Sequence, residues 1–263
     1  MTDRAAHETG LRRGTLVAPG TGSTMAGALA LGLDLGTPAV RIDADGAVFT
    51  VAAAQAADAS GVVQGFADAT GGFLTSAYTP NAGLAVERFG DWLRIPPDAV
   101  ADRTEISVWP DLDGDDDPSS LEMAAVVFGL RYETTAAEIL LGVYEGVVAT
   151  LLELLEAVGK QAGRRMDPAS PLILTGEGAA SDVWKLTLRR LSGRPLVIPH
   201  PRELAPLGAA VEAAALLGNE SPAAVAKRWE TRRGTVVRAV RRDEEALARI
   251  RRVRERLRGL ARL

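Results

Sequence analysis

The stretch Pro171–Gly218 decides the fold, and it reads PLILTGEGAASDVWKLTLRRLSGRPLVIPHPRELAPLGAAVEAAALLG. An apolar run, a glycine-containing turn, a helical pattern, a second apolar run and a second helical pattern follow one another. This order predicts strand, turn, helix, strand and helix. A turn at a helix N-terminus leaves backbone N–H groups unpaired, which suits a nucleotide or another anion. We therefore expect Gly176 and Gly178 to line a cleft.

The rest of the chain alternates in a similar way, with antiparallel strands first and strand–helix pairs later. The expected strands lie near 39–43, 47–53, 62–67 and 73–79. The expected helices lie near 24–33, 82–93, 134–161, 181–192 and 203–217. Helix 134–161 is apolar on all sides, which predicts a buried central position.

The Pro171–Gly218 string closely resembles the adenosine-binding segment of the FGGY carbohydrate kinases, above all xylulokinases, which reads roughly TGGGAKSxLW…ADxxGxPVxxPxxxEAAALGAAxLAAxALG. Residues 14–52, GTLVAPGTGSTMAGALALGLDLGTPAVRIDADGAVFTVA, run without a gap against the start of that family's C-terminal domain. Residues 65–83 resemble its GFxHAxxGxxLPxxxTLNAG segment, and Tyr144–Val147 resembles its LEGV helix. The resemblance covers about four fifths of the chain. It implies the α/β, ribonuclease-H-like fold of actin and sugar kinases, a mixed sheet flanked by helices.

Those kinases have two domains of similar size, and the resemblance implies that this chain begins where the second one begins. We expect a tail at 1–13, a kinase C-terminal-like domain at 14–227 and an arginine-rich extension at 228–263. In the family this domain holds ATP or ADP with Mg²⁺ while a ketose or polyol is phosphorylated. The resemblance places the adenosine pocket at Gly176, Glu177, Gly178, Ala179, Ser181, Glu203 and Gly208, with Glu177 in place of the family's middle glycine.

The residue expected to act as the base departs from the family. Gly20, Thr21, Gly22 and Ser23 match its GTGD motif, whose aspartate takes the proton from the sugar hydroxyl. A serine hydroxyl is a poor base near neutral pH, and losing such a group costs roughly 10²- to 10⁴-fold in rate. A structural alternative is a helix-capping turn, in which Ser23 or Thr21 accepts from the first turn of helix 24–33.

The phosphate loop departs as well. Asp43, Ala44, Asp45 and Gly46 stand where the family has GTSG, whose N–H groups and hydroxyls cradle the terminal phosphates. Two carboxylates facing a triphosphate repel it, because screening there is partial. A Mg²⁺ ion could bridge aspartate to phosphate. The alternative is a plain β-hairpin, for which an Asp-Gly turn between apolar strands is typical.

Two further features leave alternatives open. The family's GERTP segment corresponds to Gly114–Pro118, where its arginine is absent. The acidic run 111–117 could suggest a Ca²⁺ site, but it lacks the glutamate that closes an EF-hand loop, so a solvated loop is favoured. His200, between two prolines, lies either near the adenine pocket or in an exposed turn.

Composition limits the chemistry. With 263 residues, 47% of them hydrophobic, the chain can bury a full core. The absence of cysteine excludes disulfides and thiol catalysis, and two histidines are too few for a histidine-built metal centre. Without a membrane-length apolar run or an apolar signal region, a cytoplasmic location is expected.

The arginine-rich extension has helical periodicity. Leu247, Ile250, Val253, Leu257 and Leu260 recur at helical spacing, which predicts an amphipathic helix packed on the domain or on a partner. Nucleic acid and acidic lipid are the weaker alternatives, because no aromatic residues interleave the arginines. We therefore expect neither nucleic acid nor a membrane as a partner.

Three classes of function remain. The chain is the nucleotide half of a sugar kinase that needs a separate N-terminal-domain protein, or a non-catalytic pseudokinase that binds or assembles, or a fragment with no role of its own. Phosphoryl transfer depends on positioning and on charge stabilisation of the phosphates. We expect the isolated chain to be inactive, and the surface around Ser23, Asp43 and Gly178 to contact a partner or a second copy of the chain.

Overall fold

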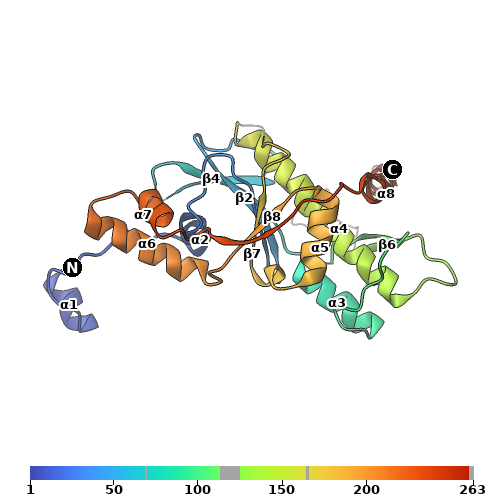
Figure 1. Ribbon diagram of the computed structural model, residues 1–263, viewed down its shortest axis with the longest axis horizontal. Helices are drawn as coiled ribbons and strands as arrows, with labels where there is room; N and C mark the ends of the chain where they lie inside the picture. The colour runs from blue at the N-terminus through green and yellow to red at the C-terminus, as the bar shows by residue number, and fades with distance from the viewer. Residues whose placement is uncertain (69, 113–124, 164–165, 261–263) are drawn as a thin grey trace.

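A mixed seven-stranded sheet forms the centre of the computed structural model, which describes residues 1–68, 70–112, 125–163 and 166–260 (Figure 1). The strand order is β3-β4-β2-β1-β7-β8-β9. Strands β3, β4, β2 and β1 pair antiparallel, β1, β7 and β8 pair parallel, and β9 closes the far edge antiparallel to β8. The strands are β1 (Ala39–Ile42), β2 (Gly46–Ala52), β3 (Val63–Ala67), β4 (Phe73–Thr79), β7 (Leu172–Thr175), β8 (Leu196–Pro199) and β9 (Gly234–Val237).

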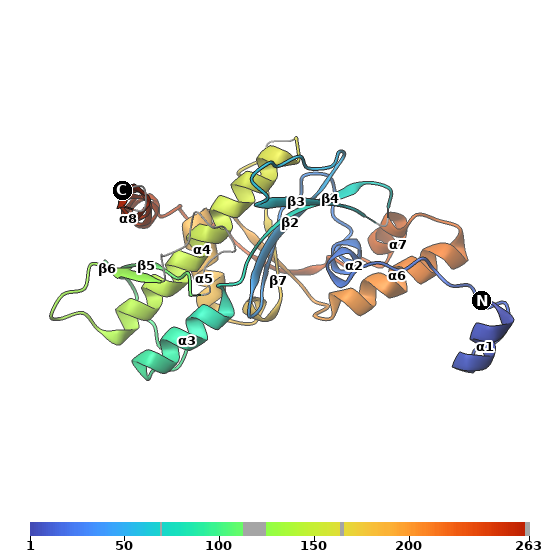
Figure 2. The same cartoon turned by 180° about the vertical axis from the view of Figure 1, so that it is seen from behind.

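Helices cover both faces of the sheet. Helices α2, α6 and α7 lie on one side, and α3, α4 and α5 on the other (Figures 1 and 2). The helices are α1 (Asp3–Thr9), α2 (Ser23–Ala30), α3 (Gly83–Leu93), α4 (Ala136–Gln161), α5 (Asp182–Ser192), α6 (Leu204–Gly218), α7 (Pro222–Arg228) and α8 (Glu244–Leu260). A short 3₁₀ turn, η1 (Glu177–Ala179), and a two-stranded sheet of β5 (Ser107–Trp109) and β6 (Val126–Phe128) complete the described elements.

Alternating strand residues build a core on each face. Val40 and Ile42 of β1 pack with α4, whereas Ala39 packs with Leu31 beside α2. This is the period of two expected for a strand buried on both faces. The expected strands and helices are confirmed to within one or two residues, apart from the end of α2. That helix stops at Ala30 instead of 33, because Gly32 turns the backbone to φ 52°.

Helix α4 is the buried centre of one layer, as its all-round apolar sequence predicts. A capping box of Thr135 and Glu138 begins it. Strand β5 crosses α4 so closely that a Cβ at Gly146 would lie 2.2 Å from the carbonyl oxygen of Val108. Gly146 is therefore required by packing between these two elements.

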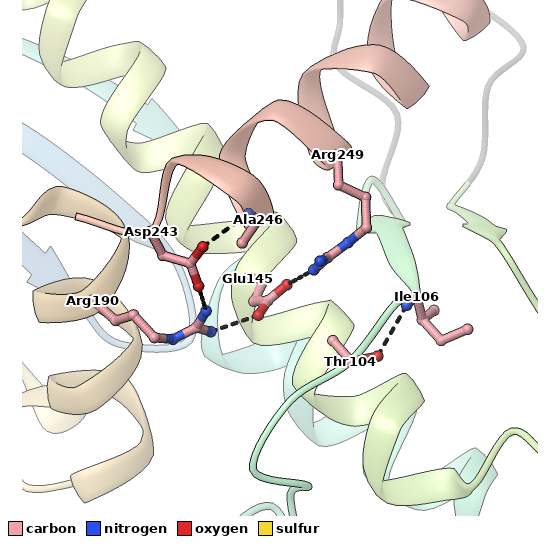
Figure 3. Close-up of polar contacts among 7 residues, drawn as sticks. All are labelled: Thr104, Ile106, Glu145, Arg190, Asp243, Ala246 and Arg249. Carbon is pink, nitrogen blue, oxygen red and sulfur yellow. Dashed lines mark hydrogen bonds and ion pairs between the residues drawn. The ribbon is translucent and has the colours of Figure 1, made fainter. Parts of the chain in front are cut away.

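A buried ion-pair cluster joins α8 to this layer (Figure 3). Glu145 of α4, with 2% of its side chain exposed, pairs with Arg190 of α5 at 2.5 Å and with Arg249 of α8. Asp243 also pairs with Arg190 at 2.5 Å, and it accepts a hydrogen bond from the N–H of Ala246. Part of the positive charge of the C-terminal extension is therefore neutralised by ion pairs within the domain.

The periodic apolar residues of the extension face the domain. Leu247, Ile250 and Val253 are buried, which is the packing that their spacing predicts. Strand β9, from the same extension, is an edge strand of the main sheet. Within the part of the chain that the structure describes, no helix is long and apolar enough to cross a membrane.

Candidate functional site

A cavity of about 800 Å³ opens at the carboxyl ends of β1, β7 and β8. In open α/β sheets this is where ligands bind, because the loops that follow parallel strands converge there. Three loops do so here: the hairpin after β1, the glycine turn after β7 and the segment from Ile198 to Ala205 after β8. The first turn of α2 forms a further wall.

The glycine turn packs directly against the hairpin. Gly176 has φ 81°, and a Cβ there would lie 2.4 Å from the carbonyl oxygen of Ile42. A Cβ at Gly178 would lie 2.6 Å from Cβ of Ile42. Only glycine fits at such approaches. Gly176 lines the cavity, but Gly178 is buried beneath Ile42, so the expectation that both glycines line the cleft is wrong for Gly178.

The turn also satisfies most of its own donors. The N–H groups of Ala179, Ala180 and Ser181 donate to the carbonyl oxygens three residues earlier, at 3.1, 2.9 and 3.2 Å. The N–H of Glu177 donates to Oδ1 of Asp43 at 2.8 Å. The expectation of unpaired amides pointing outward is therefore wrong for these positions. Ser181 caps α5 by accepting from the N–H of Trp184, and it does not line the cavity.

The segment after β1 is a hairpin, as the sequence predicts, but its turn is Asp43–Asp45 and not Asp45-Gly46, because Gly46 is the first residue of β2. Ile42 pairs with Gly46, and the N–H of Asp43 donates to the carbonyl oxygen of Asp45 at 2.8 Å. Gly46 is buried against Leu151 of α4, where a Cβ would come within 2.9 Å of Cδ2. Its role is thus in packing, and neither Gly46 nor Ala44 lines the cavity.

Arg41 neutralises part of the hairpin charge. Its Nη1 contacts Oδ2 of Asp43 at 2.5 Å and its Nη2 contacts Oδ2 of Asp45 at 2.6 Å. Burial lowers the pKa of Arg41, but the hydrogen bonds and charges of Asp45 and Asp43 outweigh burial and leave the pKa above its ordinary value. We missed Arg41 in the sequence, although its spacing of two and four residues from the aspartates was a signal.

Ser23 lies at the cavity but caps nothing. It is the first residue of α2, and the N-cap position belongs to Gly22, which has no side-chain bond to the helix. The expected cap by Ser23 or Thr21 is therefore wrong, because a residue inside the first turn lacks the extended backbone of an N-cap. Gly20, Thr21 and Gly22 lie in an exposed segment outside the lining of the cavity.

Of the remaining expected residues, Glu203 lines the cavity and Gly208 does not. Glu203, the N-cap of α6, lines the cavity. Gly208 lies at the crossing of α6 and α2, where a Cβ would be 1.9 Å from the carbonyl oxygen of Ala26. Of the expected site, the cavity brings together Ser23, Asp43, Gly176, Glu177, Ala179 and Glu203. It does not include Gly20, Thr21, Gly22, Ala44, Asp45, Gly46, Gly178, Ser181 or Gly208.

Several residues that line the cavity belong to no motif and were not predicted from the sequence. Ile198 contributes apolar surface, whereas Phe49 and Leu174 lie beneath the floor of the cavity and are 4% and 0% exposed. Arg202 contributes a charge, and His200 is exposed and lines the cavity too. Gly114–Pro118 lies outside the described residues. Among those described, no group of three or more acidic or histidine side chains could hold a metal ion.

Comparison with known proteins agrees with this geometry. Residues 51–217 match the C-terminal domain of the FGGY family of carbohydrate kinases. The chain is 44% identical over 249 residues to a xylulose kinase from Streptomyces rubiginosus and, equally, to one from Streptomyces coelicolor. Each match covers 95% of this chain and 51% of the relative. The chain thus spans about half the length of these relatives.

Solved structures match the fold. A gluconate kinase from Lactobacillus acidophilus superposes with a TM-score of 0.81 at 16% identity, over 99% of this chain and 55% of that one. A xylulose kinase from Rhodospirillum rubrum gives a TM-score of 0.76 at 19% identity, over 100% of this chain and 56% of that one. The sheet and its helix layers therefore define a domain of the actin-like class found in sugar kinases. The chain belongs to the FGGY family of carbohydrate kinases, as a C-terminal domain of the xylulose kinase type.

Proposed function

We propose that this chain is the nucleotide-binding half of a sugar phosphotransferase whose acceptor is a ketose or polyol. The observation that carries the proposal is the cavity at the carboxyl ends of β1, β7 and β8, with Gly176 and Ala179 of the family's adenosine turn in its wall. FGGY kinases use ATP with Mg²⁺. The partly buried Ala179 and Ile198 offer apolar surface that fits the adenosine part of that cofactor.

The phosphate part does not fit. Asp43 lines the cavity and already accepts from the N–H of Glu177, so a phosphate meets a carboxylate where the family offers donors. Among the described residues no group of three or more acidic or histidine side chains could hold a metal by itself, so only a Mg²⁺ ion bridging Asp43 to the phosphate would offset this charge. We derive no transfer step through ATP from this chain alone.

The acid–base chemistry is incomplete as well. Ser23 lines the cavity at the first turn of α2, at the position of the family's catalytic aspartate. A serine hydroxyl by itself is a poor base for the sugar proton near neutral pH. We propose that catalysis by this chain is impaired, or depends on an N-terminal kinase-domain protein that supplies the rest of the sugar site.

A non-catalytic role is the second candidate. The bond between Asp43 and the glycine turn favours it, because it joins the loop at the phosphate position to the loop at the adenosine position by an internal contact. In this case the chain is a pseudokinase that acts by binding or assembly, through the surface around Ser23 and Asp43. The contacting partner is an N-terminal kinase half or a second copy of the chain.

An activity assay separates the two candidates. Purified chain is mixed with MgATP and xylulose, ribulose or glycerol, with and without the N-terminal half of a full-length xylulose kinase, and ADP release is followed. The kinase role predicts turnover only with the added half, whereas the pseudokinase role predicts none in either mixture. Turnover by the chain alone contradicts both.

A further inference from the structure

We propose that Asp43 makes the cavity selective for a nucleoside over its phosphates, because its carboxylate occupies the end where phosphates would bind. This inference rests on the proposed nucleotide site and names the class of ligand that the site takes. It concerns a residue that lines the cavity and touches both loops that meet there.

The carboxylate of Asp43 is held from two sides. Its Oδ1 accepts from the N–H of Glu177 at 2.8 Å, and its Oδ2 contacts Nη1 of Arg41 at 2.5 Å. Gly176 keeps this approach open, because a Cβ there would lie 2.6 Å from Oδ1 of Asp43. The carboxylate is therefore positioned by one cation and one backbone donor, the same two kinds of partner that a bound phosphate uses.

Most donors of the glycine turn are already engaged. The N–H of Glu177 bonds to Asp43, and the N–H groups of Ala179 and Ala180 bond to carbonyl oxygens of the turn itself. A phosphate would have to displace one of these bonds to use the amide concerned. An uncharged ribose carries no charge that the carboxylate of Asp43 repels.

The negative charge around the cavity also disfavours the binding of a phosphate. Arg41 gives both terminal nitrogens to Asp43 and Asp45, so one guanidinium faces two carboxylates and leaves a net charge of −1. Glu177 and Glu203 add two further carboxylates to the lining of the cavity and Arg202 adds one cation, so the charged groups named here sum to −2. Each phosphate added to a ligand raises the repulsion from these groups, because charges in a partly buried cavity are screened less by salt than charges in open solvent.

Calorimetric titration of the full chain with adenosine, AMP and MgATP tests the inference. The wild-type affinity is expected to fall in that order, by about tenfold from adenosine to AMP, the size of one partly screened charge contact. Raising NaCl from about 0.05 M to about 0.5 M is expected to reduce the difference in affinity between adenosine and AMP. This salt dependence needs no variant, so it decides the matter even if a substitution unfolds the protein.

The variant Asp43→Asn removes the charge and keeps an oxygen that accepts from Glu177, while Asp45 continues to hold Arg41. We expect it to strengthen AMP and MgATP binding about tenfold and to leave adenosine binding unchanged. The matched control is Asp68→Asn. Asp68 also lies at a hairpin and accepts backbone N–H bonds at 2.8 Å, from Thr70 and Gly72, but it does not line the cavity.

Two outcomes overturn the inference in different ways. The selectivity is refuted, while the nucleotide site stands, if MgATP binds the wild type more tightly than adenosine does. It is also refuted if Asp43→Asn and Asp68→Asn increase the affinity for AMP and MgATP equally. If none of the three ligands binds any of the three proteins, the nucleotide site itself is refuted and the selectivity with it.

Discussion

The N–H of Glu177 donates a 2.8 Å hydrogen bond to Oδ1 of Asp43, across 134 positions of sequence. This bond joins the hairpin after β1 to the turn after β7, and both segments border the same cavity. The two segments carry the phosphate and adenosine motifs in related kinases, and here they contact each other through a carboxylate. Because the donor is the backbone N–H of Glu177, the contact depends on the carboxylate at position 43 and not on the side chain at 177.

Restoring the family residues is expected to restore some activity. We predict that Ser23→Asp combined with Asp43→Gly, Ala44→Thr and Asp45→Ser, mixed with the N-terminal half of a xylulose kinase, phosphorylates xylulose at a measurable rate. A carboxylate base alone contributes roughly 10²- to 10⁴-fold. The control is the same loop with Ser23 retained, which is expected to bind MgATP but turn over at least about 100-fold more slowly. Equal rates with and without the aspartate would show that position 23 is not the base.

Gly176→Ala tests the contact between the turn and the hairpin. At φ 81° a side chain is strained, and its Cβ would also meet the carbonyl oxygen of Ile42 at 2.4 Å. We expect a loss of about 2 kcal/mol or more in the free energy of unfolding, measured by urea denaturation. Gly61→Ala is the matched control, since Gly61 has φ 76° and nothing within 4 Å of the added Cβ. It is expected to cost only about 1 kcal/mol, and equal losses would refute the packing argument.

Glu145→Gln tests how α8 is held. The substitution leaves Arg190 and Arg249 without the carboxylate that both of them contact in the interior. Breaking a buried pair in this way is expected to cost about 3 kcal/mol in the free energy of unfolding. The control is Glu156→Gln on the same helix, whose ion pair with Lys160 is 71% exposed on the glutamate side and is expected to contribute little. A loss no larger than that of the control would mean that apolar contacts alone hold α8.

Tyr144 is expected to make stability fall at high pH. Burial, followed by the charge of Asp98, raises the pKa of Tyr144 to about 12, from an ordinary value near 10. The unfolded chain therefore releases this proton first as pH rises. The stabilisation is complete below pH 10 and is lost between about pH 10 and 12, by about 2 to 3 kcal/mol.

The variant Tyr144→Phe isolates this effect from the other groups that titrate at high pH. It removes the hydroxyl that donates to the carbonyl oxygen of Pro97 at 3.0 Å, so its stability at pH 8 is expected to be lower by about 1 kcal/mol. Between pH 10 and 12 the difference between the two proteins is expected to fall to zero and then reverse, because the wild type loses about 2 to 3 kcal/mol there and Tyr144→Phe does not. A constant difference over this range would contradict the raised pKa.

Local patterns in the sequence were enough to predict the elements. Apolar runs of strand length, the hairpin after Ala39–Ile42 and the all-round apolar helix Ala136–Gln161 each reflect interactions between residues near in sequence. The motif strings were also enough to predict the family and the three segments that meet at the cavity. The end of α2 was misplaced, because the conformation of Gly32 overrides the helical periodicity before it.

Only the tertiary structure decided which residues of the site contact one another. Which glycine faces the cavity depends on how the turn packs against Ile42, and the pairing of Glu145 with Arg249 spans 104 positions. The donors of the glycine turn were expected to be free, yet Asp43 and the turn's own carbonyl oxygens accept them. Such contacts depend on side chains brought together by the sheet, and no local period or turn propensity encodes them.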